Sequence, residues 1–150
     1  MINTLRSEYD HLLASPFFVK KDDLGIPMIE CTIGQRIFHK TFCDIRSGVN
    51  IMSKVTYEYL FGNEPLYPTY MQLQMANQSI RFLEEIAKDV LVRIHNHFAP
   101  IDFMVLDMGE EEDDTPIILG RPFLNTTIAI IYVGSRQIHF QFHIKRYVVM

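Results

Sequence analysis

The stretch TFCDIRSGVNIMSKVTYEYL, residues 41–60, contains an apolar run that ends in a single carboxylate, Asp44. A small polar turn follows, and the pattern then becomes that of a short helix over residues 53–60, which Ser53 can cap and Gly62 can close. A carboxylate at the point where a buried strand emerges is a candidate catalytic group, although aspartate is also common at strand ends. The stretch therefore predicts a strand, a turn and a helix.

Strand-length segments separated by turns make up most of the remaining chain. Residues 27–33 and 36–43 predict a hairpin around Gly34-Gln35, and residues 70–75 alternate before a polar turn, as in a second hairpin. The other predicted strands cover residues 80–82, 88–94, 100–108, 115–120, 128–133 and 137–142. Short strands at this spacing, two short helices and no detectable internal repeat predict an all-β, or mainly β, fold that closes into a small barrel.

The composition is that of one folded domain. The chain has 150 residues, of which 48% are hydrophobic and 21% charged, and its formal charge is −4. This charge gives no reason to expect nucleic acid or a membrane surface as a partner, and no apolar run approaches the ~20 residues of a membrane span. Polar residues follow Met1, and Cys31 and Cys43 are expected to stay reduced, so we expect an intracellular protein that is not secreted.

A second motif, PIILGRPFL at residues 116–124, predicts a short apolar strand that leads directly into a helix. Gly120 permits a close approach of backbones or a positive φ. Arg121 can bind a nearby carboxylate or carbonyl group, and the proline after it suits the first turn of a helix. The alternative interpretation is a strand-to-helix corner with a surface arginine.

Taken in order, these two motifs and the polar-tipped hairpin between them resemble the retropepsin-like aspartic proteases, in particular those of plant gypsy-type LTR retrotransposon polyproteins. The segments that carry the resemblance are CDIRSGVNIMSKVTYEYL, MQLQMANQSI, KDVLVRI with APIDFMVLDM, and TPIILGRPFL. The resemblance as a whole covers about residues 26–142. Residues 1–25 are expected to be a poorly ordered lead-in and residues 143–150 a C-terminal tail. The resemblance implies the closed β-barrel of the acid protease fold.

The activity that the resemblance implies is that of an aspartic endopeptidase, which would process a retroelement polyprotein in the cytoplasm or in a retroelement particle. Two aspartates share a proton in such a site, where one activates a water molecule and the other polarises the peptide carbonyl. The chain offers only Asp44, because Asp23-Leu24-Gly25 and Asp107-Met108-Gly109 are not expected to end buried strands. A homodimer is therefore implied, with a peptide as substrate and without a cofactor.

The same resemblance assigns roles to three further groups of residues: the active-site loop, the flap that covers the cleft, and the support of the site. They are Ile45, Arg46, Ser47 and Gly48 in the loop; Ala76, Asn77, Gln78 and Ser79 in the flap; and Gly120 and Arg121 in the support. The terminal strand and the tail would be dimer elements.

The two residues after Asp44 differ from the family pattern. Ile45 stands where the family usually has a serine or threonine that bonds across the dimer, and Arg46 stands where it has glycine. Arg46 excludes a glycine-only backbone geometry, and its charge opposes the sharing of a proton between two carboxylates. Leu83-Glu84-Glu85 also replaces a Pro-x-Gly bend of the flap. We therefore expect impaired activity, and the alternative is an inactive module that dimerises or binds peptide.

Histidine and acidic residues give no metal-site pattern. The pairs His95 with His97 and His139 with His143 lack cysteine or acidic neighbours at the spacing of zinc ligands. The acidic run at residues 110–114 lacks the glycine and spacing of a calcium loop. No metal site is predicted.

Overall fold

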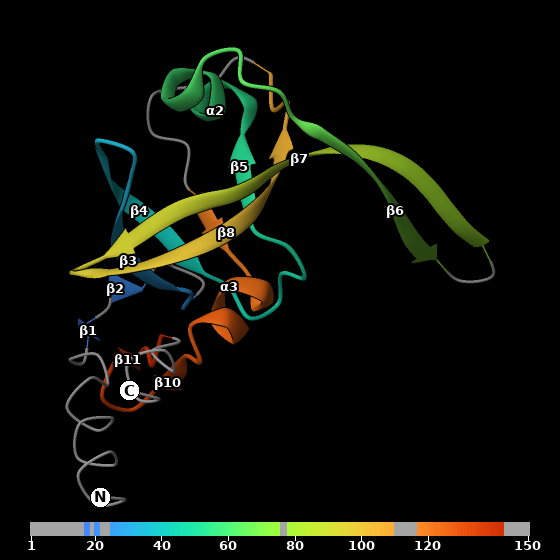
Figure 1. The fold of residues 1–150 in the computed structure, drawn as a ribbon. Coiled ribbons are helices and arrows are strands. Elements are labelled where there is room, and N and C mark those ends of the chain that lie inside the picture. The colour runs from blue at the N-terminus through green and yellow to red at the C-terminus, as the bar shows by residue number, and fades with distance from the viewer. Residues whose placement is uncertain (1–16, 19, 22–24, 76–77, 110–116, 143–150) are drawn as a thin grey trace, which may run out of the picture.

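The computed structural model describes residues 17–18, 20–21, 25–75, 78–109 and 117–142 (Figure 1). The elements in these ranges are β1 (Phe17–Phe18), β2 (Lys20–Lys21), β3 (Pro27–Ile33), β4 (Arg36–Cys43), β5 (Ile51–Ser53), α2 (Lys54–Phe61), β6 (Tyr67–Met75), β7 (Gln78–Ile94), β8 (His97–Leu106), β9 (Ile117–Leu119), α3 (Arg121–Thr126), β10 (Ile130–Tyr132) and β11 (Gln137–His139). Neither helix is long and apolar enough to cross a membrane.

Six strands close into a barrel in the order β3-β4-β9-β5-β8-β7, and the pairing of β7 with β3 completes the ring. β2 and β6 extend the sheet beside β3 and β7, while β1, β11 and β10 form a separate three-stranded sheet. The barrel is mixed, because β4 with β9 and β5 with β8 are parallel pairs and the others are antiparallel. The prediction of a mainly β, closed barrel with two short helices is confirmed.

Two strand–loop–strand–helix units interlock within this barrel. One unit runs from β4 through β5 to α2, and the other runs from β8 through β9 to α3. Each parallel pair joins the two units, and β5 meets β9 antiparallel where Ile51 pairs with Ile118. Since Ile51 and Ile118 are equivalent, the residues that follow them, Met52 and Leu119, are equivalent too. Cys43 of β4 pairs with Leu119 and Val105 of β8 pairs with Met52, so Cys43 is equivalent to Val105. The fold thus contains an approximate two-fold repeat that the sequence does not reveal.

The core fills the barrel and continues under α3. Fully buried side chains such as Val92 and Phe103 occupy the barrel, and Phe123 of α3 packs edge to face on Phe140 with ring centroids 5.7 Å apart. This aromatic pair ties the segment after β11 to the second helix. The C-terminal part of the described chain is therefore part of the same core.

The hairpin of β6 and β7 projects from the barrel as a two-stranded ribbon (Figure 1). Sequence patterns predicted separate strands at residues 80–82 and 88–94, but β7 is one strand of 17 residues. The expected break is absent because Glu85 pairs with both Pro68 and Val105, so the ladders to β6 and β8 overlap. The irregularity lies further on, between Ala87 and Val90, where the pairing with β8 shifts register.

Candidate functional site

A seven-residue connection from Asp44 to Asn50 joins β4 to β5 and contains the predicted active-site loop. The amide of Asp44 donates to the carbonyl of Leu119 at 2.9 Å, which extends the parallel pairing of β4 with β9 by one bond. The Asp44 side chain is 19% exposed. Its Oδ1 accepts hydrogen bonds from the backbone N–H of Arg46 at 2.9 Å and from the Nε of the same arginine at 3.2 Å. Asp44 therefore lies at the rim of the core with one oxygen occupied.

The turn at Asp44 does not require glycine at position 46. The bond from the Arg46 amide to Asp44 Oδ1 is a side-chain turn that any residue with an ordinary φ can form. Arg46 lies outside the left-handed region. Arg46 thus occupies an ordinary backbone conformation and not a glycine-only one, and the departure at position 46 concerns charge and bulk.

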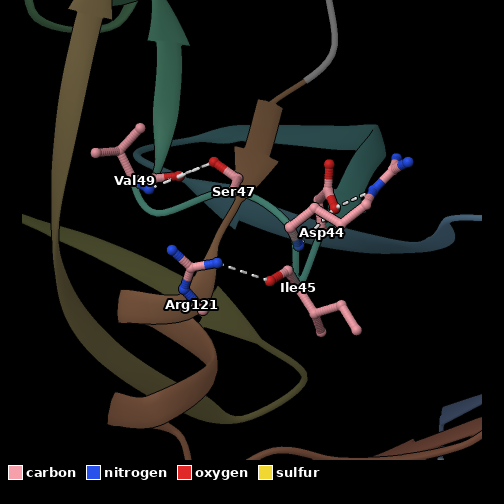
Figure 2. A network of polar contacts seen from close by, with 6 residues as sticks. Asp44, Ile45, Ser47, Val49 and Arg121 are labelled. Atoms are coloured by element: carbon pink, nitrogen blue, oxygen red, sulfur yellow. Dashed lines mark hydrogen bonds and ion pairs between the residues drawn. The ribbon is translucent and has the colours of Figure 1, made fainter. Parts of the chain in front are cut away.

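Arg121 and Ser47 hold the rest of the loop in place (Figure 2). The Arg121 amide donates to the Ser47 carbonyl at 2.9 Å, and its guanidinium Nη1 donates to the Ile45 carbonyl at 3.2 Å. Ser47 Oγ in turn donates to the Val49 carbonyl at 2.6 Å. The guanidinium of Arg121 thus binds backbone and not Asp44, so its contribution to the site is positional.

Gly120 permits the close approach of β9 to the loop. A Cβ on Gly120 would lie 2.7 Å from the Ser47 carbonyl oxygen and would also overlap the carbonyl of Val49. Its φ of −92° is open to every residue, so the reason for glycine is space and not backbone conformation. The structure therefore brings the two sequence motifs into direct contact.

Asn50 links three elements at the end of the loop, although no role was predicted for it. Its side chain is 3% exposed, and its Oδ1 accepts the amides of Gly120 at 2.8 Å and Phe123 at 3.3 Å. Its Nδ2 donates to the carbonyl of Asp102 on β8 at 3.1 Å. A single asparagine between two apolar residues, Val49 and Ile51, was the signal in the sequence, because a buried amide needs several partners.

A pocket of about 290 Å³ opens beside Asp44. Its described lining residues come from three segments, and they are Gly25, Ile26, Pro27, Cys43, Asp44, Ile45, Arg46, Ile131, Tyr132, Val133 and Arg136. Ile45 and Val133 are 61% and 69% exposed, so apolar surface borders the carboxylate. Sequence reasoning missed the contribution of the β10–β11 hairpin, which is distant from Asp44 along the chain.

The predicted flap lies only partly within the described residues. Ala76 and Asn77 fall outside them, and Gln78 and Ser79 begin β7 at the tip of the ribbon. Ile45 and Gly48 are exposed in the predicted active-site loop, with Gly48 close to the Arg121 guanidinium. One copy of the chain groups residues 44–48 with Gly120 and Arg121, and the ribbon extends from the barrel separately (Figure 1).

The two cysteines are free and buried, with Cys31 opposite Phe38 as predicted. Burial raises the pKa of the Cys31 thiol to about 11, and Thr41 Oγ1 lies 3.3 Å from its sulfur. Burial also raises the pKa of Cys43, the residue before Asp44. Both thiols are therefore protonated core groups at neutral pH.

Asp107 differs from its expected position. It directly follows β8, in which Phe103 to Val105 are buried, so the expectation that it does not end a buried strand is wrong. Its Oδ1 accepts the amide of Gly109 at 3.0 Å, in the same kind of turn as at Asp44. However, the two-fold repeat makes Leu106 the residue equivalent to Asp44, and Asp107 is exposed one residue later. Asp23 lies outside the described residues.

Aromatic rings lie against His97 and His139, one histidine of each predicted pair. His97 stacks on Phe142 with centroids 4.8 Å apart, and His139 lies against Tyr132 at 4.7 Å. Among the described residues, no three His, Cys, Asp or Glu side chains gather closely enough to hold a metal ion. His143 and the acidic run at 110–114 fall outside them.

Comparisons with known proteins find neither a matching family model nor a matching curated protein. The resemblance therefore depends on the sequence segments that carry it, from CDIRSGVNIMSKVTYEYL to TPIILGRPFL.

Proposed function

We propose that this chain is an aspartic endopeptidase of the retropepsin type, in which two copies each contribute Asp44 to one site. The observation that carries the proposal is the position of Asp44: a partly buried carboxylate at the end of a core strand, in a loop that Gly120 and Arg121 hold from a second strand and helix. Such fixation is what a catalytic group needs, because small displacements cost much of the rate.

The need for two copies follows from the two-fold repeat within one chain. The end of β4 carries Asp44, whereas the equivalent end of β8 carries Leu106, so one copy supplies a single carboxylate at these positions. Two Asp44 side chains brought together would share a proton, and the ionised one would accept a proton from water while the protonated one bonds the scissile carbonyl. The reaction is hydrolysis of a peptide bond, without a cofactor.

Arg46 limits this activity in the proposed enzyme. Its amide and Nε both bond Asp44 Oδ1, and the Nε bond keeps a guanidinium beside the carboxylate that would share a proton with a second copy. The amide bond orients Asp44 without adding a net charge, so only the side chain interferes. Replacing Arg46 with alanine or glycine should therefore release the site while keeping the amide bond.

The substrate of the proposed enzyme is an extended peptide, and the implied natural substrate is a retroelement polyprotein processed inside the cell or particle. The ribbon of β6 and β7 would cover the bound peptide. Leu83-Glu84-Glu85 lies within the continuous β7, so this ribbon has no Pro-x-Gly bend at which to fold. We expect it to move as a stiff unit about its base.

The test compares four proteins on a mixture of unstructured peptides between pH 4 and 7, with products identified by mass spectrometry. We expect weak cleavage by the wild type, at least tenfold faster cleavage by Arg46→Ala and Arg46→Gly, and none by Asp44→Asn in an Arg46→Ala background. Pepstatin should block cleavage. Sedimentation should show a dimer in the active samples, and cleavage by a strict monomer would refute the two-copy mechanism.

The Arg46–Asp44 contact also favours a second candidate function, an inactive module that dimerises or binds peptide. Ile45 adds to this, since it has no hydroxyl with which to bond across a dimer. Absence of cleavage in the wild type and in both Arg46 variants, together with retained peptide binding, would select this candidate.

A further inference from the structure

A second pocket, of about 450 Å³, lies between α2, the start of β6 and the register shift of β7. It shares no lining residue with the pocket beside Asp44. Gly34, which lines it, precedes β4 and Asp44 follows β4, so the eight residues of that strand, about 25 Å, separate the two pockets. α2 and the β3–β4 turn also lie at the end of the barrel opposite β10 and β11 (Figure 1). A second copy that joined at Asp44 and the terminal strands would therefore leave this pocket open.

Aromatic rings form one wall of this α2 pocket. Tyr57 and Phe61 lie one turn apart in α2 with ring centroids separated by 5.3 Å, and Tyr67 begins β6. All three line the pocket, as does the exposed Leu91. The face of an aromatic ring attracts cations because it carries negative partial charge. The chain itself provides an example, since Lys88 Nζ lies 4.9 Å from the centroid of the Tyr67 ring.

Two carboxylates border the same pocket. Glu64 and Asp89 are exposed, and neither forms an ion pair with another residue in the described ranges. Lys88 is the one basic residue among the described residues that line the pocket. The acids therefore outnumber the base, and the α2 pocket combines negative charge with aromatic walls.

Hydrogen bonds hold both acidic residues in position. The Tyr57 hydroxyl donates to the Glu64 carbonyl at 3.1 Å, which fixes the segment after α2. The Asp89 amide donates to Asp102 Oδ1 at 2.9 Å, and its φ of 54° is one that aspartate tolerates better than most residues. Burial raises the pKa of the Tyr57 hydroxyl, and the charge of Glu64 raises it further. The negative potential of Glu64 therefore reaches the aromatic wall.

We propose that the α2 pocket binds an organic cation, an ammonium or guanidinium group attached to an apolar body. The carboxylates of Glu64 and Asp89 attract the charge, and the apolar body packs on Tyr57, Phe61 and Leu91. A volume of about 450 Å³ falls within the ~300–1,000 Å³ typical of small-ligand sites. It suits a free amine or a lysine or arginine side chain with one neighbouring residue. This inference goes beyond the proposed function and needs neither the candidate site nor a second copy.

Three probes of one shape test the charge requirement: 3-phenylpropylamine, which is cationic, 3-phenylpropanol, which is neutral, and 3-phenylpropanoate, which is anionic. Each is titrated into the wild type at pH 7 and about 0.1 M salt, at which distant charges are screened, and the amide NMR signals report binding. We expect a Kd of about 0.3–3 mM for the amine and binding at least about threefold weaker for the alcohol. The acid should bind most weakly. Equal or tighter binding of the alcohol or the acid would overturn the inference.

Four variants locate the site. Glu64→Gln and Asp89→Asn should each weaken amine binding about 2- to 5-fold, because each removes one charge and keeps the backbone hydrogen bonds of the pocket. The matched control is Glu58→Gln, an exposed acid of α2 that does not line the pocket, which should change binding by less than about 1.5-fold. Lys88→Met should strengthen binding about 2- to 5-fold, since it removes the competing cation. An equal effect of the three acid variants, or weaker binding by Lys88→Met, would contradict the assignment.

A blocked pentapeptide distinguishes the two sources of the cation. Acetyl-Ala-Leu-Lys-Leu-Ala-amide should bind more tightly than the amine where the ligand is a basic side chain of a protein segment, and less tightly where it is a free amine. The same peptide with norleucine in place of lysine is the control for charge. Failure of both the amine and the lysine peptide to shift the amides of Phe61 and Asp89 would refute the inference.

The outcomes separate this inference from the proposed function. Cation binding without cleavage in any Arg46 variant would remove the endopeptidase and keep the α2 pocket as a binding site. Cleavage without cation binding would keep the endopeptidase and remove this site.

Discussion

Replacement of Asn50 by alanine should destabilise the protein by removing hydrogen bonds that connect the loop at residues 44–50 to α3 and β8. The amide side chain accepts from the Gly120 and Phe123 N–H groups and donates to the Asp102 carbonyl. Asn50 is 3% exposed, so alanine would leave these backbone groups without a partner in a region with little access to water.

The magnitude follows from the geometry of the three bonds. A buried donor or acceptor left unpaired costs about 1–3 kcal/mol. The 2.8 Å bond to Gly120 and the 3.1 Å bond to Asp102 should account for most of the loss, and the 3.3 Å bond to Phe123 for less. Because the space left by the side chain can admit a water molecule, we expect a total of about 2–4 kcal/mol.

Urea unfolding followed by far-UV circular dichroism measures this change, since the chain has no tryptophan to report by fluorescence. The midpoint should fall by about 1–2 M with an unchanged slope. Hydrogen exchange provides a local check, because the amides of Gly120 and Phe123 should lose protection before the rest of the core.

The matched control is Asn125→Ala, which makes the same replacement at an exposed position of α3 and should change stability by less than about 0.5 kcal/mol. An Asn50→Ala protein as stable as this control, with the amides of Gly120 and Phe123 still protected, would show that Asn50 does not anchor the loop.

Three other predictions concern stability. Gly120→Ala should cost about 1–3 kcal/mol in urea unfolding, because its Cβ would lie 2.7 Å from the Ser47 carbonyl oxygen, and an unchanged midpoint would mean that the loop can shift freely. Ser53→Ala should cost about 1 kcal/mol by the same assay, since Ser53 Oγ accepts the Thr56 amide at 3.1 Å at the start of α2; a loss below 0.3 kcal/mol would contradict this. Cys31 should lower the stability by about 2–3 kcal/mol as the pH rises from about 9 to 11, because burial raises its pKa from 9.0 to about 11 and the unfolded chain loses this proton first. Cys43, whose pKa burial also raises, adds to this fall. The fall should be smaller in Cys31→Ala, and equal slopes would exclude this thiol as the cause.

Local turn and cap chemistry made several elements predictable from the sequence. The turn at Gly34-Gln35 forms with Gly34 at a φ of 62°, and α2 begins after Ser53 and ends at Gly62 as predicted. Each of these features depends on residues within one turn of the backbone, so the sequence pattern contains the necessary information.

Long-range pairing made the remaining features unpredictable. The parallel pairs of β4 with β9 and β5 with β8 join distant segments, and nothing in either strand specifies its partner. The same limitation hid the two-fold repeat, since the equivalent residues Cys43 and Val105 share only burial. It also hid the pocket wall formed by Ile131 to Val133 and Arg136, whose position beside Asp44 depends on how the β10–β11 hairpin packs.

The candidate site was predictable as a pair of motifs. Its chemistry also depends on whether a position needs a small residue for space or a particular backbone conformation. Glycine at position 120 is needed for space, whereas at position 46 the backbone accepts a side chain, because the Arg46 amide bonds Asp44 Oδ1 at an ordinary φ. The family pattern has glycine at both positions and does not distinguish these two requirements. The structure separates them: a side chain at position 120 would displace the loop itself, while the one at position 46 leaves Asp44 oriented and occupies the space beside it. Arginine at position 46 is therefore a reversible obstacle to catalysis in the proposed enzyme, and its removal by alanine should release activity as fully as its removal by glycine.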